Sequence, residues 1–94
     1  MSHSATLSWS EAASSDPATG FNIHRADLSA GPFAVIGSSP TSPYVDNTVV
    51  GGKTYFYEVT ATNAAGESGP SNEVTATITV SLPPAPTGLS IVVA

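Results

Sequence analysis

The stretch Lys53-Thr-Tyr-Phe-Tyr-Glu-Val-Thr-Ala-Thr-Asn63 is the longest strand-like pattern in the chain. Its side chains alternate with a period of two, which places every second residue on the same face of a strand. The face that we expect to point inward carries Tyr55, Tyr57, Val59 and Ala61. Turn-forming glycines precede this stretch at positions 51 and 52, and Asn63-Ala-Ala-Gly66 follows it. We therefore predict that it is a central strand of an all-β sandwich.

Five shorter stretches show similar alternation or apolar clustering, and turn-forming residues separate them. They cover residues 5–9, 21–25, 33–36, 44–45 and 71–80. About six strands at short, regular spacing, with no stretch of helical period, are typical of a β-sandwich or barrel. Because Pro43 and Asp46 flank the stretch 44–45, we expect it to form only a brief edge strand.

The predicted core combines the inward-facing aromatic and aliphatic residues of these strands. Its members are Trp9, Phe21, Ile23, Tyr44, Tyr55, Tyr57 and Val59. We expect them to be mostly buried and to contact one another across two sheets about 10 Å apart. The last strand should add Val74, Ala76 and Ile78 on one face, whereas Phe56 should point outward.

Composition excludes several classes of partner. The chain has 94 residues, which is enough for one domain with a modest core. Its net charge is −5, and its only basic residues other than histidine are Arg25 and Lys53, so we expect neither nucleic acid nor an anionic membrane as a partner. The chain lacks cysteine, a recognisable signal peptide and a long apolar run.

Five motifs, taken in order, resemble a fibronectin type III domain of the kind found in secreted bacterial enzymes that act on polysaccharides. They are Leu7-Ser-Trp9, Gly20-Phe-Asn-Ile23, Tyr44-Val-Asp46, the stretch 54–68 and Pro70-Ser-Asn-Glu-Val74. The resemblance implies an immunoglobulin-like β-sandwich of about seven strands, a non-catalytic role and an extracellular parent protein. It also places Tyr55 at the tyrosine corner, where the hydroxyl bonds to nearby backbone. We expect this hydroxyl to matter more than that of Tyr57, provided that the tip of Tyr57 reaches solvent.

One element of the family lies in an unexpected place. The family begins with strand A, which has a proline-rich start, a leucine and alternating apolar residues. Here this pattern comes last, as Pro83-Pro-Ala-Pro86-Thr-Gly-Leu89-Ser-Ile-Val-Val-Ala94, and residues 1–80 supply strands B to G. The chain therefore resembles a circularly permuted or strand-swapped domain, in which residues 81–94 form a proline-rich linker and a displaced strand A. Either a repeat array has been divided one strand out of phase, or the gene was permuted deliberately.

No group of residues indicates catalysis, a cofactor or a metal site. We expect His24 to face solvent from a strand, and His3 has no metal-binding partner at a useful spacing. The carboxylates lie in loops and on strand exteriors without the spacing of a calcium loop or a glycosidase pair. They are Glu11, Asp16, Asp27, Asp46, Glu58, Glu67 and Glu73. We expect Asp46 to cap a turn, and Asn63 and Asn72 to bond local backbone.

The favoured hypothesis is a structural module that self-associates by donating strand A to a neighbouring chain. The residues expected to carry this association are Pro86, Leu89, Ile91 and Val93 in the donor and Ala5 and Leu7 in the acceptor. The product is a swapped dimer or a head-to-tail fibre, and we favour the fibre because a short, proline-containing hinge disfavours tight reversal.

Three alternatives differ in class. One is a spacer, or a weak carbohydrate-binding module, of a secreted bacterial polysaccharide hydrolase. Carbohydrate binding usually needs several exposed aromatic rings, and Phe56 is the only one expected outside. Another is a self-closed, circularly permuted monomer, and the third is a small enzyme. We expect no small-molecule ligand.

Overall fold

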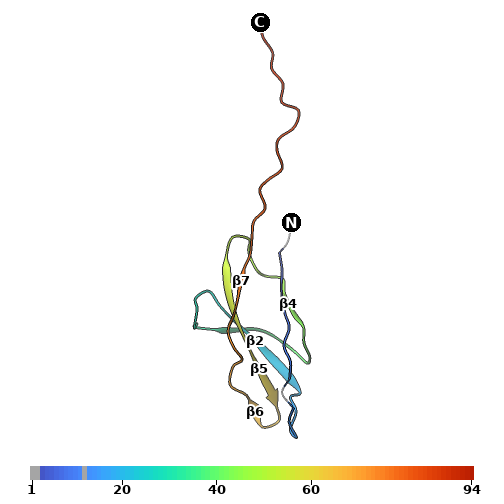
Figure 1. Ribbon diagram of the computed structural model, residues 1–94, viewed down its shortest axis with the longest axis vertical. Coiled ribbons are helices and arrows are strands. Elements are labelled where there is room, and N and C mark those ends of the chain that lie inside the picture. Colours follow the sequence, from blue (N-terminus) through green and yellow to red (C-terminus); the bar gives the residue numbers. More distant parts are fainter. Residues whose placement is uncertain (1–2, 12) are drawn as a thin grey trace.

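The computed structural model describes residues 3–11 and 13–94, and these residues form seven strands and no helix. The strands are β1 (Ala5–Leu7), β2 (Gly20–Ala26), β3 (Ala34–Ser39), β4 (Tyr44–Asp46), β5 (Thr54–Asn63), β6 (Gly66–Glu67) and β7 (Val74–Thr77). One sheet pairs β1 with β4, and the other has the order β3-β2-β5, with β6 and β7 both paired to β5. All strand pairs are antiparallel, and the predicted all-β sandwich is confirmed (Figure 1).

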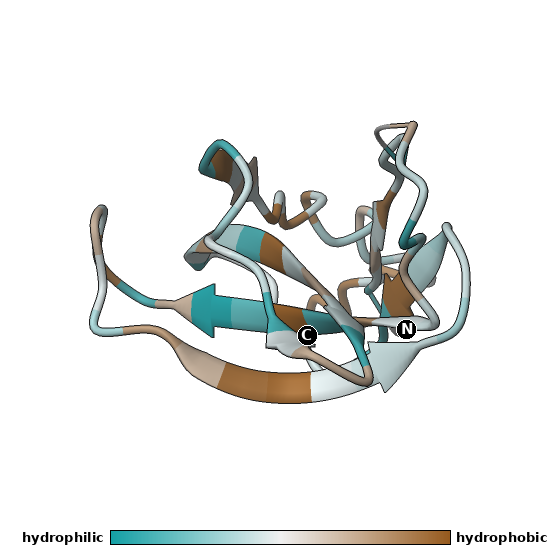
Figure 2. Cartoon of the chain, turned by 90° about the horizontal axis from the view of Figure 1, so that it is seen from below, coloured by the Kyte–Doolittle hydropathy of each residue, from teal (hydrophilic) through white to brown (hydrophobic). Residues whose placement is uncertain are grey.

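Strand β5 is the centre of the larger sheet, as its length and alternation predicted. It pairs with β2 along seven residue pairs, from Gly20 opposite Thr62 to Ala26 opposite Phe56. Figure 2 shows both hydrophobic and hydrophilic segments on the strands. Successive side chains of a strand point to opposite faces of the sheet. The inward face of β5 is consequently closed to solvent at Tyr55 and Tyr57.

The core fills the space between the two sheets. Its most buried members are Leu7, Ile23, Val49, Tyr55, Tyr57 and Ile78, and Trp9, Tyr44 and Val59 are partly buried against them. Phe21 is buried too, and its ring centroid lies 5.2 Å from that of Trp9. Val49 comes from the loop before β5, where no alternating pattern could identify it.

Several predicted boundaries were wrong. Strand β3 begins after Phe33 and continues through Gly37 to Ser39, beyond the predicted end at residue 36. The register between β2 and β3 shifts between Ile23 and His24, so Ile36 of β3 has no partner in the ladder, and residues 37–39 pair with residues 21–23. The turn after β5 contains the short strand β6, and the last strand spans only Val74–Thr77.

The face of the last strand also differs from the prediction. Ile78 is buried and Ala76 is half-buried, but Val74 is 45% exposed rather than part of the core. Val74 is the first residue of β7 and lies opposite Tyr57 of β5. In the described part of the chain, no strand pairs with the other edge of β7.

Residues 81–94 leave the sandwich as an extended tail (Figure 1). The Cα radius of gyration is 20.0 Å, although a compact chain of this length has a value of about 12 Å. The longest dimension, 83 Å, includes this tail. The start of β1 and the start of the tail lie at the same end of the sandwich (Figure 1). The described residues contain no helix that could span a membrane.

Candidate functional site

An open groove runs between β1 and β7. In the described chain, β1 pairs only with β4 and β7 pairs only with β5, so each strand has one uncovered edge. The groove between these edges has a volume of about 500 Å³. Its apolar lining includes Ala5, Leu7, Trp9, Val59, Val74 and Ala76. An uncovered strand edge above apolar side chains is the kind of surface on which another strand can dock.

The groove continues toward the loops at the far end of the sandwich. A second hollow of about 390 Å³ shares Trp9, Val59 and Ser71 with the first and extends to Asp16 and Gly69. Trp9 therefore lies where the two hollows meet. Its indole Nε1 is buried and has no hydrogen-bond partner among the described residues. A buried N–H group normally has an acceptor, so this unpaired donor is an exception among the described residues.

The residues predicted to carry self-association lie in two separate places. Ala5 and Leu7 line the groove, whereas the tail residues lie in solvent. Leu89 is 97% exposed, Ile91 is 86% exposed and Val93 is 83% exposed, and Pro86 is also exposed. Within one chain, the structure does not bring donor and acceptor together, and it does not show the self-closed arrangement.

A buried polar network connects the two sheets at Asp46. This residue is 2% exposed, which corrects the prediction that all carboxylates lie in loops and on strand exteriors. Its Oδ2 accepts a hydrogen bond from Arg25 Nη1 at 2.8 Å and another from the Tyr57 hydroxyl at 2.7 Å. Its Oδ1 accepts bonds from the backbone N–H and the hydroxyl of Thr48, so the predicted turn cap is confirmed.

The network shifts the ionisation of its members. Burial alone would raise the pKa of Asp46, but hydrogen bonds from Thr48, Tyr57 and Arg25 outweigh it and lower that pKa to about 2. Burial and the hydrogen bond to Asp46 both raise the pKa of Tyr57. Burial disfavours the charged form of Arg25, yet the neighbouring carboxylate prevails and raises its pKa. These ionised and hydrogen-bonded groups satisfy one another.

The tyrosine corner expected at Tyr55 is confirmed. Its hydroxyl accepts a hydrogen bond from the backbone N–H of Val50 at 3.0 Å. The guanidinium carbon of Arg25 and the ammonium of Lys53 lie 4.9 Å and 5.8 Å from the ring centroid. The condition attached to Tyr57 does not hold, because its hydroxyl reaches the buried Asp46 rather than solvent. Both tyrosine hydroxyls therefore have structural partners.

A polar cluster lies on the outer face of the larger sheet. His24 lies on this outer face, but its side chain is only 19% exposed rather than solvent-facing as predicted. Its Nε2 lies 3.2 Å from Thr60 Oγ1 and 3.4 Å from Glu67 Oε2. Asn22 Nδ2 donates to the same carboxylate oxygen at 3.0 Å, and the Thr60 hydroxyl also donates to it. Hydrogen bonds from Asn22 and Thr60 lower the pKa of Glu67. The cluster attaches the β6 turn to β2 and β5.

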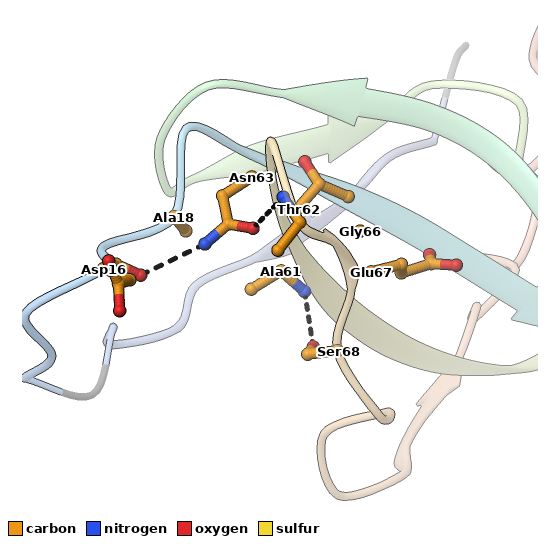
Figure 3. Close-up of a pocket in the computed structure, with 9 residues that line it drawn as sticks. Asp16, Ala18, Ala61, Thr62, Asn63, Gly66, Glu67 and Ser68 are labelled. Carbon is orange, nitrogen blue, oxygen red and sulfur yellow. Dashed lines mark hydrogen bonds between the residues drawn. The ribbon is translucent and has the colours of Figure 1, made fainter.

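A third hollow, of about 310 Å³, lies beside the β5–β6 turn (Figure 3). Asn63 crosses it, donating to the backbone carbonyl of Asp16 at 3.2 Å and accepting from Ala65 N–H at 2.9 Å. The second of these bonds is the local backbone contact predicted for Asn63. The Glu67 side chain extends away from Asp16 (Figure 3). Nowhere in residues 3–11 and 13–94 do three potential metal ligands gather.

Comparison with known proteins finds relatives among bacterial enzymes. The chain is 36% identical over 74 residues to an amylopullulanase of Thermoanaerobacter thermohydrosulfuricus, a match covering 77% of this chain and 5% of the relative. It is also 36% identical over 77 residues to a poly(3-hydroxybutyrate) depolymerase of Ralstonia pickettii, covering 81% of this chain and 14% of the relative. The chain thus spans a small part of each enzyme. No family model matches it.

Solved structures share the fold over most of the chain. An Fn3-like protein from Clostridium thermocellum superposes with a TM-score of 0.69 at 28% identity, covering 85% of this chain and 80% of that one. The fourth FNIII domain of a human protein superposes with a TM-score of 0.74 at 20% identity, covering 93% of this chain and 74% of that one.

Proposed function

Since this chain belongs to the fibronectin type III family of β-sandwich domains, we propose that it is a non-catalytic structural module whose tail completes a neighbouring copy. The proposal rests on one observation: the same chain has both an open groove with an apolar lining and an exposed apolar tail, and the two do not contact each other. Each chain supplies residues 86–93 as strand A to another chain and receives the same segment in return or from a third. The products are head-to-tail fibres or closed rings.

The energetics favour docking of the tail. Burying each of Leu89, Ile91 and Val93 contributes about 1.5–3 kcal/mol. Their sum is comparable with the total stability of a small domain, which is about 5–15 kcal/mol. A tail that remained in solvent would forgo this contribution and leave the β1 edge open to non-specific pairing.

The geometry favours a second chain as the acceptor. The tail leaves the sandwich at the end where β1 begins and extends away from it (Figure 1), so it points away from the groove of its own chain. To enter that groove as strand A, the tail must travel the length of the sandwich, about 30 Å for the ten residues of β5. The eight residues 79–86 span at most about 26–29 Å, and their prolines shorten that reach. A copy beyond the tail receives it without any reversal.

The test compares two variants with the same charge on alternate tail residues. Light scattering of the unmodified chain should show a mass that rises with concentration. Ile91→Asp places the charge on the apolar side of the tail and should keep the chain monomeric. Val92→Asp is the matched control and should assemble like the unmodified chain, because residue 92 faces the other way. A chain that stays monomeric at every concentration overturns the proposal, as does equal assembly of both variants.

The relatives favour a second candidate for the parent protein: a spacer in a secreted bacterial enzyme that degrades a polymer. Two relatives are named as an amylopullulanase and a poly(3-hydroxybutyrate) depolymerase, and the chain matches a small part of each. A spacer should not bind pullulan, amylose or poly(3-hydroxybutyrate) granules in a sedimentation assay. Binding that Phe56→Ala abolishes would contradict the spacer role and support an accessory binding module.

A further inference from the structure

We propose that the groove between β1 and β7 is the acceptor site, and that residues 86–93 of a second copy enter it antiparallel to β1 in one fixed register. The register places three donor residues opposite three acceptor residues: Leu89 opposite Trp9, Ile91 opposite Leu7, and Val93 opposite Ala5. This inference rests on the proposed function and adds the site, the direction and the residue pairing.

The alternation in β1 restricts the register. Leu7 is buried and Ala5 is half-buried, whereas Thr6 and Ser8 are exposed. In an antiparallel pair, residues that lie directly opposite share one face of the sheet. The apolar set of the tail must therefore lie opposite positions 5, 7 and 9. A slip of one residue would turn that set to solvent and point Ser90 into the groove.

Trp9 distinguishes the remaining registers. A slip of two residues toward the start of β1 leaves Trp9 uncovered, and a slip of two the other way leaves Ala5 without an apolar partner. The proposed register covers both positions. It also brings the backbone around residues 86–88 past the indole, where a carbonyl can accept the hydrogen bond that Trp9 Nε1 lacks within the described residues.

The opposite wall of the groove agrees with this assignment. Val74, Thr75 and Ala76 of β7 line the groove, and Val74 is exposed although the sequence pattern predicts that it faces inward. An incoming strand that runs antiparallel to β1 covers this side chain. Residues 75–94 carry no charged side chain, so docking them removes no charged side chain of the tail from water.

The experiment uses disulfide cross-linking, for which the cysteine-free chain provides a clean background. One full-length variant carries Ser90→Cys and is mixed, in turn, with variants carrying Thr6→Cys, Ser8→Cys or Ser10→Cys. All three acceptor positions are exposed. The proposed register sets Ser90 opposite Ser8, within the Cα separation of about 4.4–6.8 Å that a disulfide requires. The other two positions are one side-chain repeat further along the strand, outside that range.

Under mild oxidation, the Ser8→Cys mixture should give a disulfide-linked dimer of the two variants, and the other two mixtures should not. Light scattering of the same mixtures, recorded under reducing conditions, separates the outcomes. A rise in mass with cross-linking at Thr6→Cys or Ser10→Cys overturns the register and leaves the proposed function standing. A rise in mass with none of the three cross-links overturns the groove as acceptor.

Two further results test the proposed function itself and whether the acceptor is a second chain. No rise in mass in any mixture overturns the proposed function, and the acceptor site with it. The double variant Ser8→Cys with Ser90→Cys, oxidised at high dilution, should not form a disulfide within one chain. An intrachain disulfide there overturns the inference in favour of the self-closed monomer.

Discussion

At the scale of single residues, Asp46 connects several parts of the fold, because its carboxylate accepts hydrogen bonds from Arg25, Thr48 and Tyr57. It belongs to β4 in the smaller sheet, and it binds Arg25 of β2 and Tyr57 of β5 in the larger one. A buried charge is stable only when its partners satisfy it, and these partners come from the larger sheet and from Thr48 in the loop after β4. Asp46 therefore fixes how the two sheets face each other, as well as the turn at Thr48.

The two tyrosine hydroxyls should not be equivalent. Tyr57→Phe removes a donor from a buried carboxylate, and a hydrogen bond to a charged group contributes about 1.5–3 kcal/mol. Tyr55→Phe leaves the Val50 N–H without its acceptor and should cost about 1 kcal/mol, because that site is less buried. Urea denaturation of both variants measures the difference. A Tyr57→Phe variant as stable as the parent would contradict the role given to Asp46.

The same carboxylate predicts a loss of stability in acid. The ordinary pKa of 3.8 applies to Asp46 in the unfolded chain, and the value falls to about 2 in the folded chain. The ionised form therefore stabilises the fold above pH 4, and this contribution is lost as the pH falls from about 4 to about 2. A shift of nearly two pKa units corresponds to about 2.5 kcal/mol. Carbon-detected NMR titration of the Asp46 carboxyl isolates it from other acids, and a midpoint near 4 would contradict this prediction.

Sequence reasoning identified residues by alternation, and its successes and failures follow from that. Phe21, Ile23, Tyr55 and Tyr57 lie on regular strands and are buried. Val49 is buried in a loop, and Asp46 is a buried acid, so neither follows from a period of two. Two features of the sequence could have drawn attention to Asp46. It lies between an edge strand and the turn at Thr48, and Arg25 continues the inward-facing alternation of Phe21 and Ile23, which calls for a buried acidic partner.

At the scale of elements, β3 depends on a close approach that requires glycine. A Cβ built on Gly37 would lie 2.3 Å from the hydroxyl oxygen of Tyr44 and 2.9 Å from its ring carbon Cζ. The tyrosine of β4 thus packs directly over the backbone of β3, next to the bulge between Ile23 and His24. The segment 37–39 pairs with β2 through its backbone but has no alternating apolar side chains, which explains why the sequence pattern ended the strand at residue 36.

Substitution of this glycine should destabilise the sandwich. Gly37→Ala forces the partly buried Tyr44 ring to move, and overpacking of this kind costs about 1–3 kcal/mol. Gly69→Ala is the matched control, because a Cβ there meets no atom within 4 Å. Thermal unfolding of both variants measures the difference. Equal midpoints for Gly37→Ala and Gly69→Ala would show that the ring moves without cost.

At the scale of the whole molecule, the sequence allowed the all-β architecture to be predicted, since it follows from patterns along the chain. The displaced strand A stays a prediction. The path of the tail could not be predicted from a sequence pattern, because it depends on the geometry of the sandwich. It depends on which end of the sandwich β7 reaches, and the structure places that end beside the start of β1 (Figure 1). The vacant groove beyond Trp9 likewise follows from the pairing of strands rather than from any local motif.

Salt should strengthen assembly. Each chain carries a net charge of −5, so neighbouring copies repel one another, and dissolved ions screen this repulsion. The donor segment has no charged side chain, so salt has no ion pair to weaken between the tail and the groove. Light scattering at low and high sodium chloride should show a larger mean mass at high salt. A mass that falls with salt would indicate that charge pairs hold the copies together.

A free peptide with the sequence of residues 81–94 should act as a chain terminator. It offers the same donor strand but carries no sandwich, so a chain that binds it in its groove has no acceptor site left for another copy. Excess peptide should lower the mean mass of assemblies toward the monomer, whereas a peptide carrying Ile91→Asp should leave it unchanged. The peptide should also raise the thermal midpoint of Ile91→Asp full-length chains, whose own tails cannot compete, because a ligand present at about 100 times its dissociation constant stabilises the folded state by about 2.7 kcal/mol. If the peptide changes neither the mean mass nor the thermal midpoint, residues 81–94 do not contain strand A and do not bind the groove between β1 and β7.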